Sequence, residues 1–403
     1  MEKVQKSRET CITVAILLPD RQEDEVSEHL DELEDLIDTA GAEVIARVIQ
    51  RRDRPDPATF IGRGKAEEIT HLAGVHNVQT VVFDDDLTPA QIRNLEKIID
   101  IKILDRSSLI MDIFASHART REAKTQVELA QYRYLLPRLT RQWTHLSRQV
   151  GGIGVRGVGE TQLETDRRII NRRISHLQKE LDKINLSRKT QRARREQLPR
   201  VSIVGYTNAG KSTLFNQLTR GEQKVEDRLF ATLDSKISRV TIGQNFPVLF
   251  SDTVGFIRKL PHHLVASFRS TLEEALESDL VLLLLDISHP AVEDHETVAR
   301  EVLADLGVQP ESILKVYNKI DRLAQPRASD SVLAVSARTG EGLGHLLDEI
   351  QQRLMKYFVE IIYAYPIEDQ ESIRDCMRRG TVLDVHQEET MTHIKIRQRR
   401  DHR

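Results

Sequence analysis

A multidomain α/β fold is predicted for this chain of 403 residues, because three patterns follow one another along it. Short apolar runs first alternate with helical patterns, which is typical of a parallel sheet. Two stretches with apolar residues at alternating steps of three and four then flank a glycine-rich segment, which is typical of an antiparallel helical hairpin. Finally, the segment GYTNAGKS lies between an apolar run and an amphipathic stretch, the setting of a phosphate-binding loop, or P-loop.

Four parts of the chain are expected from these patterns. They are an N-terminal parallel α/β domain at 1–120, a basic helical hairpin at 121–198, a P-loop domain at 199–355 and a small C-terminal α/β unit at 356–403. Charge separates the second part from its neighbours, since the net charge is +11 over residues 121–200, −9 before them and −5 after them. The hairpin is therefore a basic module between two acidic ones.

The N-terminal domain is expected to contain strands at 12–18, 44–49, 78–83 and 101–104. Thr88 and Gln91 match a capping box, with Pro89 at the first helical position, so a helix should begin there. The fragment Gly-Arg-Gly-Lys at 62–65 resembles part of a phosphate site but is short, and a plain turn is the favoured interpretation.

The hairpin is expected to pair two long helices through their apolar seams. The seam positions are Leu129, Tyr132, Leu136, Leu139, Trp143, Leu146 and Val150 on the first helix, and Ile170, Ile174, Leu177, Leu181 and Ile184 on the second. Pro137 should kink the first helix or split it in two. Residues 151–159 contain five glycines, which disfavour a helix, so they are expected to form a mobile loop at the tip of the hairpin.

RNA is the expected target of this tip, because glycines let backbone N–H groups approach phosphates and arginines add attraction that does not depend on base sequence. The candidate contacts are Gly151, Gly152, Gly154, Arg156, Gly157, Gly159, Arg167 and Arg168. The alternative is that these arginines only solvate the outer face of a helical pair, as charged helices commonly do. The glycine-rich loop favours the nucleic-acid interpretation.

The P-loop provides separate parts for a phosphate chain. Gly205 and Gly210 allow a tight turn that points backbone N–H groups at phosphate oxygens. Lys211 supplies a positive charge for the β and γ phosphates, and the Ser212 hydroxyl is placed to hold Mg²⁺. A nucleotide and a magnesium ion are therefore the expected ligands.

Guanine is the base favoured by the segment Asn318-Lys319-Ile320-Asp321. A carboxylate such as Asp321 can accept both N1–H and the 2-amino group of guanine, whereas adenine offers no such pair of donors. Asn318 and Lys319 are expected to brace the loops and pack on the base. Ser336 and Ala337 follow an apolar run and are candidates to offer a backbone N–H to the guanine carbonyl oxygen. GTP and GDP are therefore the expected nucleotides.

Two further segments are expected to sense the third phosphate. Asp252 should reach Mg²⁺ through a water molecule, and the Gly255 N–H should sense the γ phosphate. Thr232 is the candidate threonine that closes on Mg²⁺ in the GTP-bound state, with a solvated loop threonine as the alternative. Catalysis is assigned to Lys211, Thr232 and Gly255. The full set expected at GTP is Gly205, Tyr206, Thr207, Asn208, Ala209, Gly210, Lys211, Ser212, Thr213, Phe230, Thr232, Asp252, Gly255, Asn318, Lys319, Asp321, Ser336 and Ala337.

Slow intrinsic hydrolysis is expected, because Phe256 stands where many such proteins have a glutamine that orients the attacking water. A partner should then order these segments or supply a catalytic group. Asn208 is compatible with a bound K⁺ ion that adds positive charge near the phosphates.

Composition points to a cytoplasmic protein without membrane insertion. Cys11 and Cys376 lie far apart and suggest no disulfide framework, and the longest apolar run, 281–285, is far too short to span a membrane. The start of the chain lacks a secretory pattern. A monomer is expected.

The chain resembles the HflX family of translation-factor-related GTPases over nearly its whole length. The resemblance is carried by WTHLSRQVGGIGVRGVGETQLETDRR, GYTNAGKSTLFN, LFATLD, DTVGFIRKLPHHLVASFRSTLEEALESDL and NKID. It implies a GTP hydrolase with a low intrinsic rate that ribosomes stimulate, binding to the large ribosomal subunit and its rRNA, and dissociation or rescue of ribosomes under stress. After ATLD the family commonly continues with proline and threonines, whereas Ser235, Lys236 and Ile237 follow here, which puts details of this segment in doubt.

Two other functions remain open on the sequence. One is a signalling GTPase whose helical hairpin binds a protein, and the other is a scaffold in which the nucleotide only stabilises the fold. A ribosome-directed GTPase predicts hydrolysis that rises with ribosomes and RNA affinity that falls with salt, whereas the signalling GTPase predicts neither. The scaffold predicts instead that Lys211→Ala impairs folding without a separable loss of activity.

Overall fold

The computed structural model describes residues 8–142, 158–193, 198–219, 221, 229–230, 232, 236–243, 245–259, 275–323 and 333–400. The chain divides into two compact units, which we describe one at a time. Unit 1 contains the described residues between 8 and 183, together with Leu229, Phe230 and Lys259, and unit 2 contains the others.

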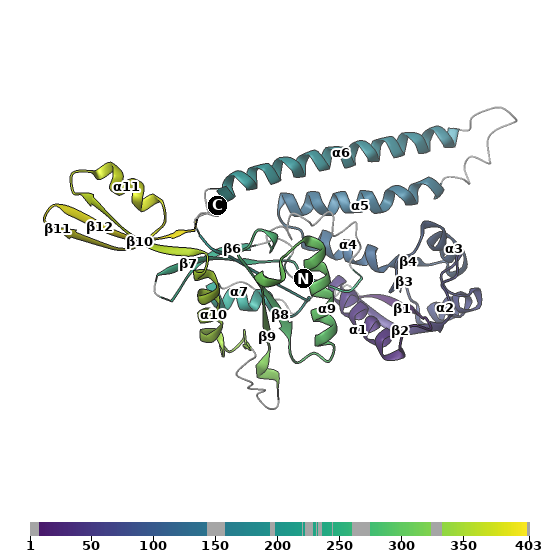
Figure 1. Cartoon of the computed structure of the whole chain (residues 1–403). Coiled ribbons are helices and arrows are strands. Elements are labelled where there is room, and N and C mark those ends of the chain that lie inside the picture. The colour runs from purple at the N-terminus through teal and green to yellow at the C-terminus, as the bar shows by residue number, and fades with distance from the viewer. Residues whose placement is uncertain are drawn as a thin grey trace, which may run out of the picture. The chain divides into compact units, whose positions relative to one another are not determined.

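The first sheet, in unit 1, is a parallel one, as predicted. Its strands are β1 (Glu9–Leu17), β2 (Ala42–Arg51), β3 (Thr80–Phe83) and β4 (Lys102–Asp105), in the order β2-β1-β3-β4. The helices that follow the strands are α1 (Glu23–Ala40), α2 (Arg63–His76), α3 (Pro89–Ile99) and α4 (Arg106–His117) (Figure 1). Strand β3 is buried along its whole length, because helices cover both faces of a parallel sheet.

Local sequence explains where two of these helices begin. The capping box predicted at Thr88 is present, since Thr88 Oγ1 accepts from the Gln91 N–H at 3.3 Å and Gln91 Oε1 accepts from the Thr88 N–H at 2.9 Å. Gly62 precedes α2, and its N–H donates to Gln50 Oε1 at 2.8 Å. The 62–65 fragment is therefore the start of an ordinary helix.

Two long helices form the predicted pair, α5 (Arg121–Gln142) and α6 (Val158–Ala193). Between them, Leu129, Leu177 and Leu181 are buried, with Tyr132 and Ile174 packed beside them. Arg121 pairs with Glu180, and Arg173 pairs with Glu128 at 2.6 Å, so the two helices run antiparallel (Figure 1). Trp143, Leu146 and Val150 lie outside the described residues.

Two outcomes were expected for Pro137, a kink or a split of the first helix, and the split was wrong. Helix α5 continues through Pro137 to Gln142. The next residue, Arg138, donates to Leu87 O at 3.0 Å and to Asp105 Oδ2 at 2.9 Å, and its guanidinium lies 3.2 Å from the centre of the Tyr134 ring. These contacts hold the chain beyond the proline, which removes only one backbone hydrogen bond.

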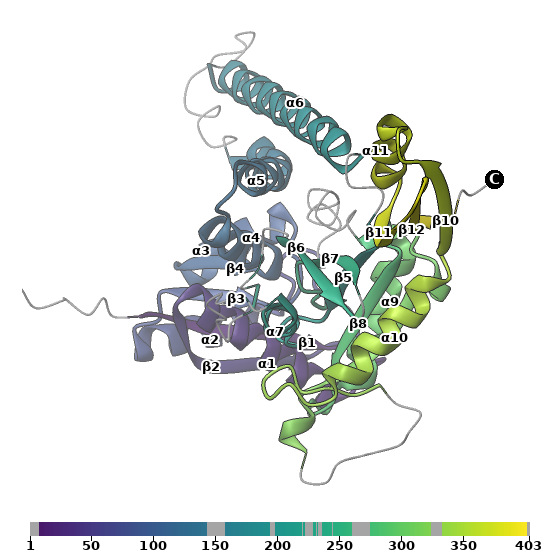
Figure 2. The same ribbon diagram turned by 90° about the vertical axis from the view of Figure 1, so that its left-hand side faces the viewer.

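The P-loop domain, in unit 2, is built on a five-stranded sheet in the order β6-β7-β5-β8-β9 (Figure 2). The strands are β5 (Arg200–Gly205), β6 (Lys236–Ile242), β7 (Phe246–Asp252), β8 (Leu280–Asp286) and β9 (Ile313–Asn318), and only β6 is antiparallel to its neighbour. The helices are α7 (Lys211–Thr219), α9 (Val292–Leu306) and α10 (Leu343–Met355), with single turns at Pro310–Ser312 and Ile320–Arg322. Helices α7 and α10 share one apolar core with the sheet.

In the part of the chain that is described, the apolar run before Ser336 forms only a bridge to β9. Tyr317 donates to Leu333 O at 2.9 Å, and Val335 donates to Tyr317 O at 2.8 Å. Two hydrogen bonds to β9 are enough to place Ser336 and Ala337 beside the end of that strand.

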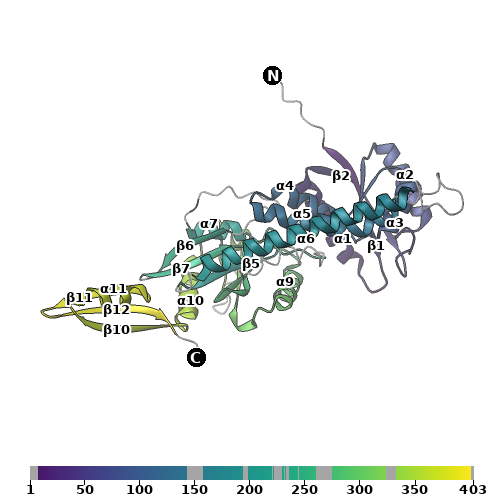
Figure 3. The same ribbon diagram turned by 90° about the horizontal axis from the view of Figure 1, so that it is seen from above.

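The C-terminal part is a three-stranded antiparallel sheet with one helix, as predicted (Figure 3). Its elements are β10 (Phe358–Pro366), α11 (Gln370–Arg378), β11 (Thr381–Glu388) and β12 (Met391–Arg399). Ile373 and Cys376 of α11 pack on Ile394 and Ile396 of β12. No helix in the described part of the chain has the length and apolarity needed to cross a membrane.

Candidate nucleotide site

The P-loop runs from the end of β5 into α7 and needs glycine at two positions. Gly205 has φ 150°, and an added Cβ would lie 2.2 Å from Leu284 O on the neighbouring strand β8. Gly210 has φ 92°, and an added Cβ would lie 2.2 Å from Asn318 Nδ2. Asn208, at the exposed bend of the loop, has φ 59°, a conformation that asparagine tolerates better than most residues.

Lys211 is buried, with 7% of its surface exposed, and its Nζ donates to Tyr206 O at 2.7 Å. Burial lowers the pKa of Lys211 to about 8, although the Asp252 carboxylate acts in the opposite direction. The Thr207 Oγ1 atom is also buried, and it has no hydrogen-bond partner among the described residues. Among the described residues, the buried Lys211 ammonium group donates its hydrogen bond to a backbone carbonyl, so it is well placed to bind a phosphate anion.

Three oxygen-bearing side chains expected at Mg²⁺ come together at the end of β7. Ser212 Oγ and Thr232 Oγ1 are 2.8 Å apart, and Thr232 Oγ1 donates to Asp252 Oδ2 at 3.3 Å. Asp252 is fully buried, and its Oδ1 has no hydrogen-bond partner in the described part of the chain. Burial raises the pKa of the Asp252 carboxyl. Two hydroxyls and a carboxylate suit a hard cation that prefers oxygen ligands, so this set of residues fits Mg²⁺.

Gly255 lies against the P-loop, where an added Cβ would be 2.8 Å from both Lys211 Nζ and Thr207 Cγ2. The next residue, Phe256, is tied to the loop at both backbone groups, because its N–H donates to Gly205 O at 3.0 Å and its carbonyl accepts from Thr207 N–H at 2.8 Å. Its side chain is only 1% exposed. The residue that replaces the expected glutamine is therefore part of the apolar core and does not face a water molecule.

The loops expected to bind guanine are joined by Asn318, which is buried at the end of β9. Its Nδ2 donates to Ala209 O of the P-loop at 2.8 Å, and its Oδ1 accepts from Ala337 N–H at 2.9 Å. Asp321 Oδ1 accepts from Ser336 Oγ at 2.6 Å. The Ala337 N–H considered for the guanine oxygen thus points at Asn318 in this structure, and the Ser336 N–H donates to Glu341 O at 2.9 Å.

Sequence reasoning missed Asp286, the last residue of β8. Its Oδ2 lies 2.7 Å from Lys319 Nζ, and this contact lowers the pKa of the carboxyl against the effect of burial. Lys319 has φ 66°, so the ion pair and the backbone together fix this residue. In the sequence, Asp286 is visible only as a carboxylate at the carboxyl end of an apolar central strand, and its partner Lys319 comes close only in the folded chain.

The other residues that were expected to contact the nucleotide lie in the P-loop, in α7 and in unit 1. Tyr206, Thr207 and Ala209 are buried in the P-loop, and Thr213 is half-buried in the first turn of α7. Phe230 belongs to unit 1, where its ring centre lies 4.6 Å from that of Phe114 in an edge-to-face contact. Its side chain is therefore packed among apolar groups of that unit.

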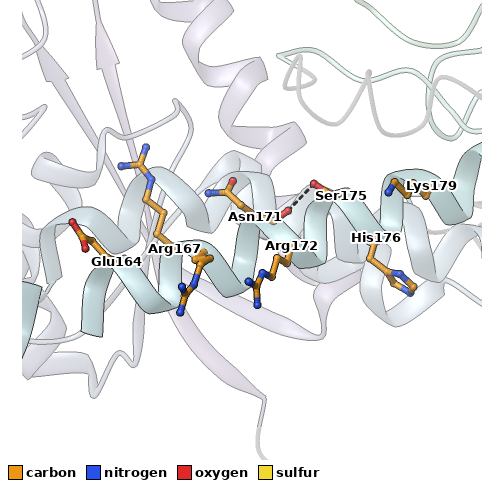
Figure 4. Close-up of a pocket in the computed structure, with 8 residues that line it drawn as sticks. Glu164, Arg167, Asn171, Arg172, Ser175, His176 and Lys179 are labelled. Carbon is orange, nitrogen blue, oxygen red and sulfur yellow. Dashed lines mark hydrogen bonds between the residues drawn. The ribbon is translucent and has the colours of Figure 1, made fainter. Parts of the chain in front are cut away.

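A basic groove follows the exposed side of α6 (Figure 4). Its lining residues are Glu164, Arg167, Arg168, Asn171, Arg172, Ser175, His176 and Lys179. Arg173, in contrast, is turned to the seam and pairs with Glu128. Gly159 lies in the first turn of α6, so the glycine-rich loop is shorter than expected on that side, and Gly151, Gly152, Gly154, Arg156 and Gly157 lie outside the described residues.

Comparisons with known proteins cover most of the chain. Residues 27–115 match the family described as GTP-binding GTPase N-terminal, residues 117–195 match GTP-binding GTPase Middle Region, and residues 200–319 match 50S ribosome-binding GTPase. The GTPase HflX of Flavobacterium psychrophilum is 51% identical over 321 residues, which is 80% of this chain and 78% of that protein. The GTPase HflX of Caldanaerobacter subterraneus subsp. tengcongensis is 43% identical over 398 residues, covering 98% of this chain and 92% of that protein.

Among solved structures, one match is a GTP-binding protein from the hyperthermophilic archaeon Sulfolobus solfataricus in complex with GDP. It is 26% identical, with 86% of this chain and 99% of that chain covered and a TM-score of 0.43.

Proposed function

The chain belongs to the HflX family of GTPases, and from this premise we propose that it is a cytoplasmic, monomeric GTPase that binds the large ribosomal subunit. It couples GTP binding and hydrolysis to the dissociation or rescue of ribosomes under stress. The basic arm, which is our name for α5, α6 and the segment between them, contacts rRNA. The chain has four domains, with boundaries after residues 120, 198 and 355.

The observation that best supports the hydrolytic part of the proposal is the meeting of Ser212, Thr232 and Asp252 beside Lys211. When bound, Mg²⁺ supplies positive charge to the β and γ phosphate oxygens. Ser212 and Thr232 would hold the ion directly, and Asp252 would hold it through a water molecule. Lys211 leaves Tyr206 O to bind the phosphates, and the Gly255 N–H meets the γ phosphate.

Base selection in this proposal depends on Asp321. Its carboxylate accepts both guanine donors, and Ser336 Oγ, at 2.6 Å, fixes its orientation. A site of this kind rejects a base that lacks the donors by on the order of 10⁴, because the Asp321 carboxylate, exposed in this structure, would be covered by the base and left unpaired. The Ala337 N–H turns from Asn318 to the guanine oxygen when the base enters.

The low intrinsic rate follows from Phe256, which is buried and has no polar group to orient water. The ribosome then has to order the segment around Gly255 or provide the missing catalytic group.

Asn208 at the exposed bend of the P-loop holds K⁺, which adds charge at the phosphates. Replacing K⁺ by Na⁺ in the assay tests this last point, and an unchanged rate would exclude it.

The groove on α6 supports the RNA-binding part of the proposal. Arg167, Arg168 and Arg172 take part in no ion pair among the described residues, whereas Arg173 and Arg121 are paired with glutamates of the hairpin. Guanidinium groups without a carboxylate partner, gathered along one side of a helix, are suited to successive phosphates of a nucleic acid.

The decisive experiment is the GTPase rate with and without purified large ribosomal subunits. We expect strong stimulation of the unmodified protein, and a loss of most of it in the variant Arg167→Gln/Arg168→Gln/Arg172→Gln. The matched control is Arg374→Gln/Arg378→Gln/Arg379→Gln, which removes three exposed arginines at α11 and should keep the stimulation. Shortening 151–159 tests the tip separately. Stimulation that survives both arm variants would remove the arm from the mechanism.

A signalling GTPase whose hairpin binds a protein remains the second candidate. It predicts no stimulation by ribosomes and little salt dependence of RNA binding. In the leading proposal each neutralised phosphate adds about 0.7 to 0.9 to the slope of log K against log salt. A slope close to zero would therefore favour the second candidate.

A further inference from the structure

Tyr206 lies at a junction of three segments that surround the phosphate site. Its carbonyl accepts from Lys211 Nζ at 2.7 Å, and its hydroxyl accepts from the backbone N–H of Arg258 at 2.7 Å. Its ring stacks on His295 of α9, with ring centres 3.7 Å apart and planes 7° apart. One residue thus connects the three segments: its backbone carbonyl contacts the P-loop lysine, and its side chain contacts the segment after Gly255 and helix α9.

The hydroxyl contact is the outermost of three hydrogen bonds that join residues 256–258 to the P-loop. The other two are backbone bonds of Phe256, to Gly205 and to Thr207. Among the described residues, no backbone hydrogen bond joins the chain after Phe256 to the P-loop. The hydrogen bond from the Arg258 N–H to the Tyr206 hydroxyl therefore takes the place of the next backbone bond. It anchors the chain three residues after Gly255.

The position of the hydroxyl is itself fixed from α9. His295 is 9% exposed, and burial, with His289 and Arg258 nearby, lowers its pKa to about 3, so the stacked imidazole is neutral at ordinary pH. The Arg258 guanidinium donates to Asp294 Oδ2 at 3.0 Å. Adjacent residues of α9 therefore hold both partners of the Tyr206–Arg258 hydrogen bond, one by stacking and one by an ion pair.

We propose that Tyr206 is a positioning residue for GTP hydrolysis, whose hydroxyl holds residues 255–258 against the P-loop so that the Gly255 N–H meets the γ phosphate. Gly255 lies so close to Lys211 and Thr207 that an added Cβ would be 2.8 Å from a side-chain atom of each, so a small displacement of this segment separates the N–H from the phosphate. Because Phe256 provides no polar group, the rate depends strongly on where the backbone of this segment lies. Binding of GDP, which lacks the γ phosphate, depends on it much less.

The test is the variant Tyr206→Phe, which removes one hydroxyl and keeps the ring on His295. We expect the single-turnover rate of GTP hydrolysis to fall about tenfold at saturating GTP, while the affinity for GDP changes by less than about twofold. Hydrogen exchange of the Arg258 amide in the full-length protein should accelerate by a similar factor, because that amide loses its acceptor. Tyr363→Phe makes the same chemical change in the C-terminal unit and should leave both readings unchanged.

A second pair of variants separates positioning from stability. His295→Phe keeps an aromatic partner for Tyr206 and should retain the rate, whereas His295→Ala removes the stack and should resemble Tyr206→Phe. The proposal is overturned if Tyr206→Phe hydrolyses GTP at the unmodified rate, or if its rate and its GDP affinity fall together by the same factor, since a purely structural tyrosine would give that result.

Discussion

Gly205 shows how tightly the site is defined by single residues. Its backbone approaches β8 so closely that an added Cβ would meet Leu284 O at 2.2 Å, and its φ of 150° is unfavourable for other residues. The obstructing Leu284 O cannot move aside, because it is a backbone atom of a strand in the centre of the sheet. At Gly210 an added Cβ would meet the Asn318 side chain, and at Gly255 it would meet the Lys211 side chain and both the side chain and the Cα of Thr207.

We predict that Gly205→Ala lowers the free energy of unfolding by about 2 kcal/mol or more and abolishes tight GTP binding. The control is Gly74→Ala in α2, where an added Cβ meets nothing within 4 Å. That substitution should raise stability by about 0.5–1 kcal/mol, because alanine favours a helix. Chemical unfolding with and without GDP measures both effects, and equal stability of the two variants would contradict the account.

The pH dependence of stability offers a test of His295. Its pKa of about 3 in the folded state lies below the ordinary value of 6.5, so the unfolded chain binds an extra proton between these limits. The stability that this group supports is complete above pH 6.5 and is lost as the pH falls below it, by up to about 1.4 kcal/mol per pH unit. Urea unfolding at pH 7.5 and pH 5.5 should show a decrease of about 1 kcal/mol that is absent in His295→Phe. A decrease of the same size in both proteins would exclude His295 as its source.

Among the helices, the α5–α6 pair depends on a small apolar seam. Leu177 is 1% exposed, whereas Leu186 on the same helix is 68% exposed. We predict that Leu177→Ala destabilises the arm by about 2–3 kcal/mol, since it leaves a cavity in a cluster with few members. Leu186→Ala should have almost no effect. Hydrogen exchange of α5 and α6 amides distinguishes the two, and equal protection in both variants would show that the seam does not hold the helices together.

Element prediction from the sequence succeeded where local patterns are strong. The capping box at Thr88 and the apolar run at 78–83 each indicate an element by themselves, so helix α3 and strand β3 appear where they were expected. Pro137 shows the opposite case. Local propensity predicts a break, but Arg138 is held by Leu87 and Asp105, which are distant in sequence, and such tertiary contacts override propensity.

The residues of the nucleotide site were likewise predictable where a short sequence motif identifies them. The phosphate loop and its neighbours have short sequence signatures, so Ser212, Thr232 and Asp252 were identified in advance, and the structure brings them together. Asp286 and the Tyr206–Arg258 contact were not predictable, because each depends on two segments that meet only in the folded chain. The same holds for the groove on α6, since only the structure shows that Arg173 is paired with Glu128, whereas Arg172 has no ion-pair partner among the described residues.

In the proposed function of the whole molecule, the third phosphate of GTP is the signal, and the basic arm contacts RNA. The two are linked if the protein binds the large subunit differently in its two nucleotide states. A ligand shifts an equilibrium between states only by the difference in its affinity for them, so this difference is the quantity to measure.

The most direct measurement is therefore the dissociation constant of the full-length protein for purified large ribosomal subunits, with a non-hydrolysable GTP analogue and with GDP, at the same salt concentration. The account predicts binding at least about tenfold tighter with the analogue, equivalent to roughly 1.4 kcal/mol of coupling. Equal affinity in the two nucleotide states would contradict it.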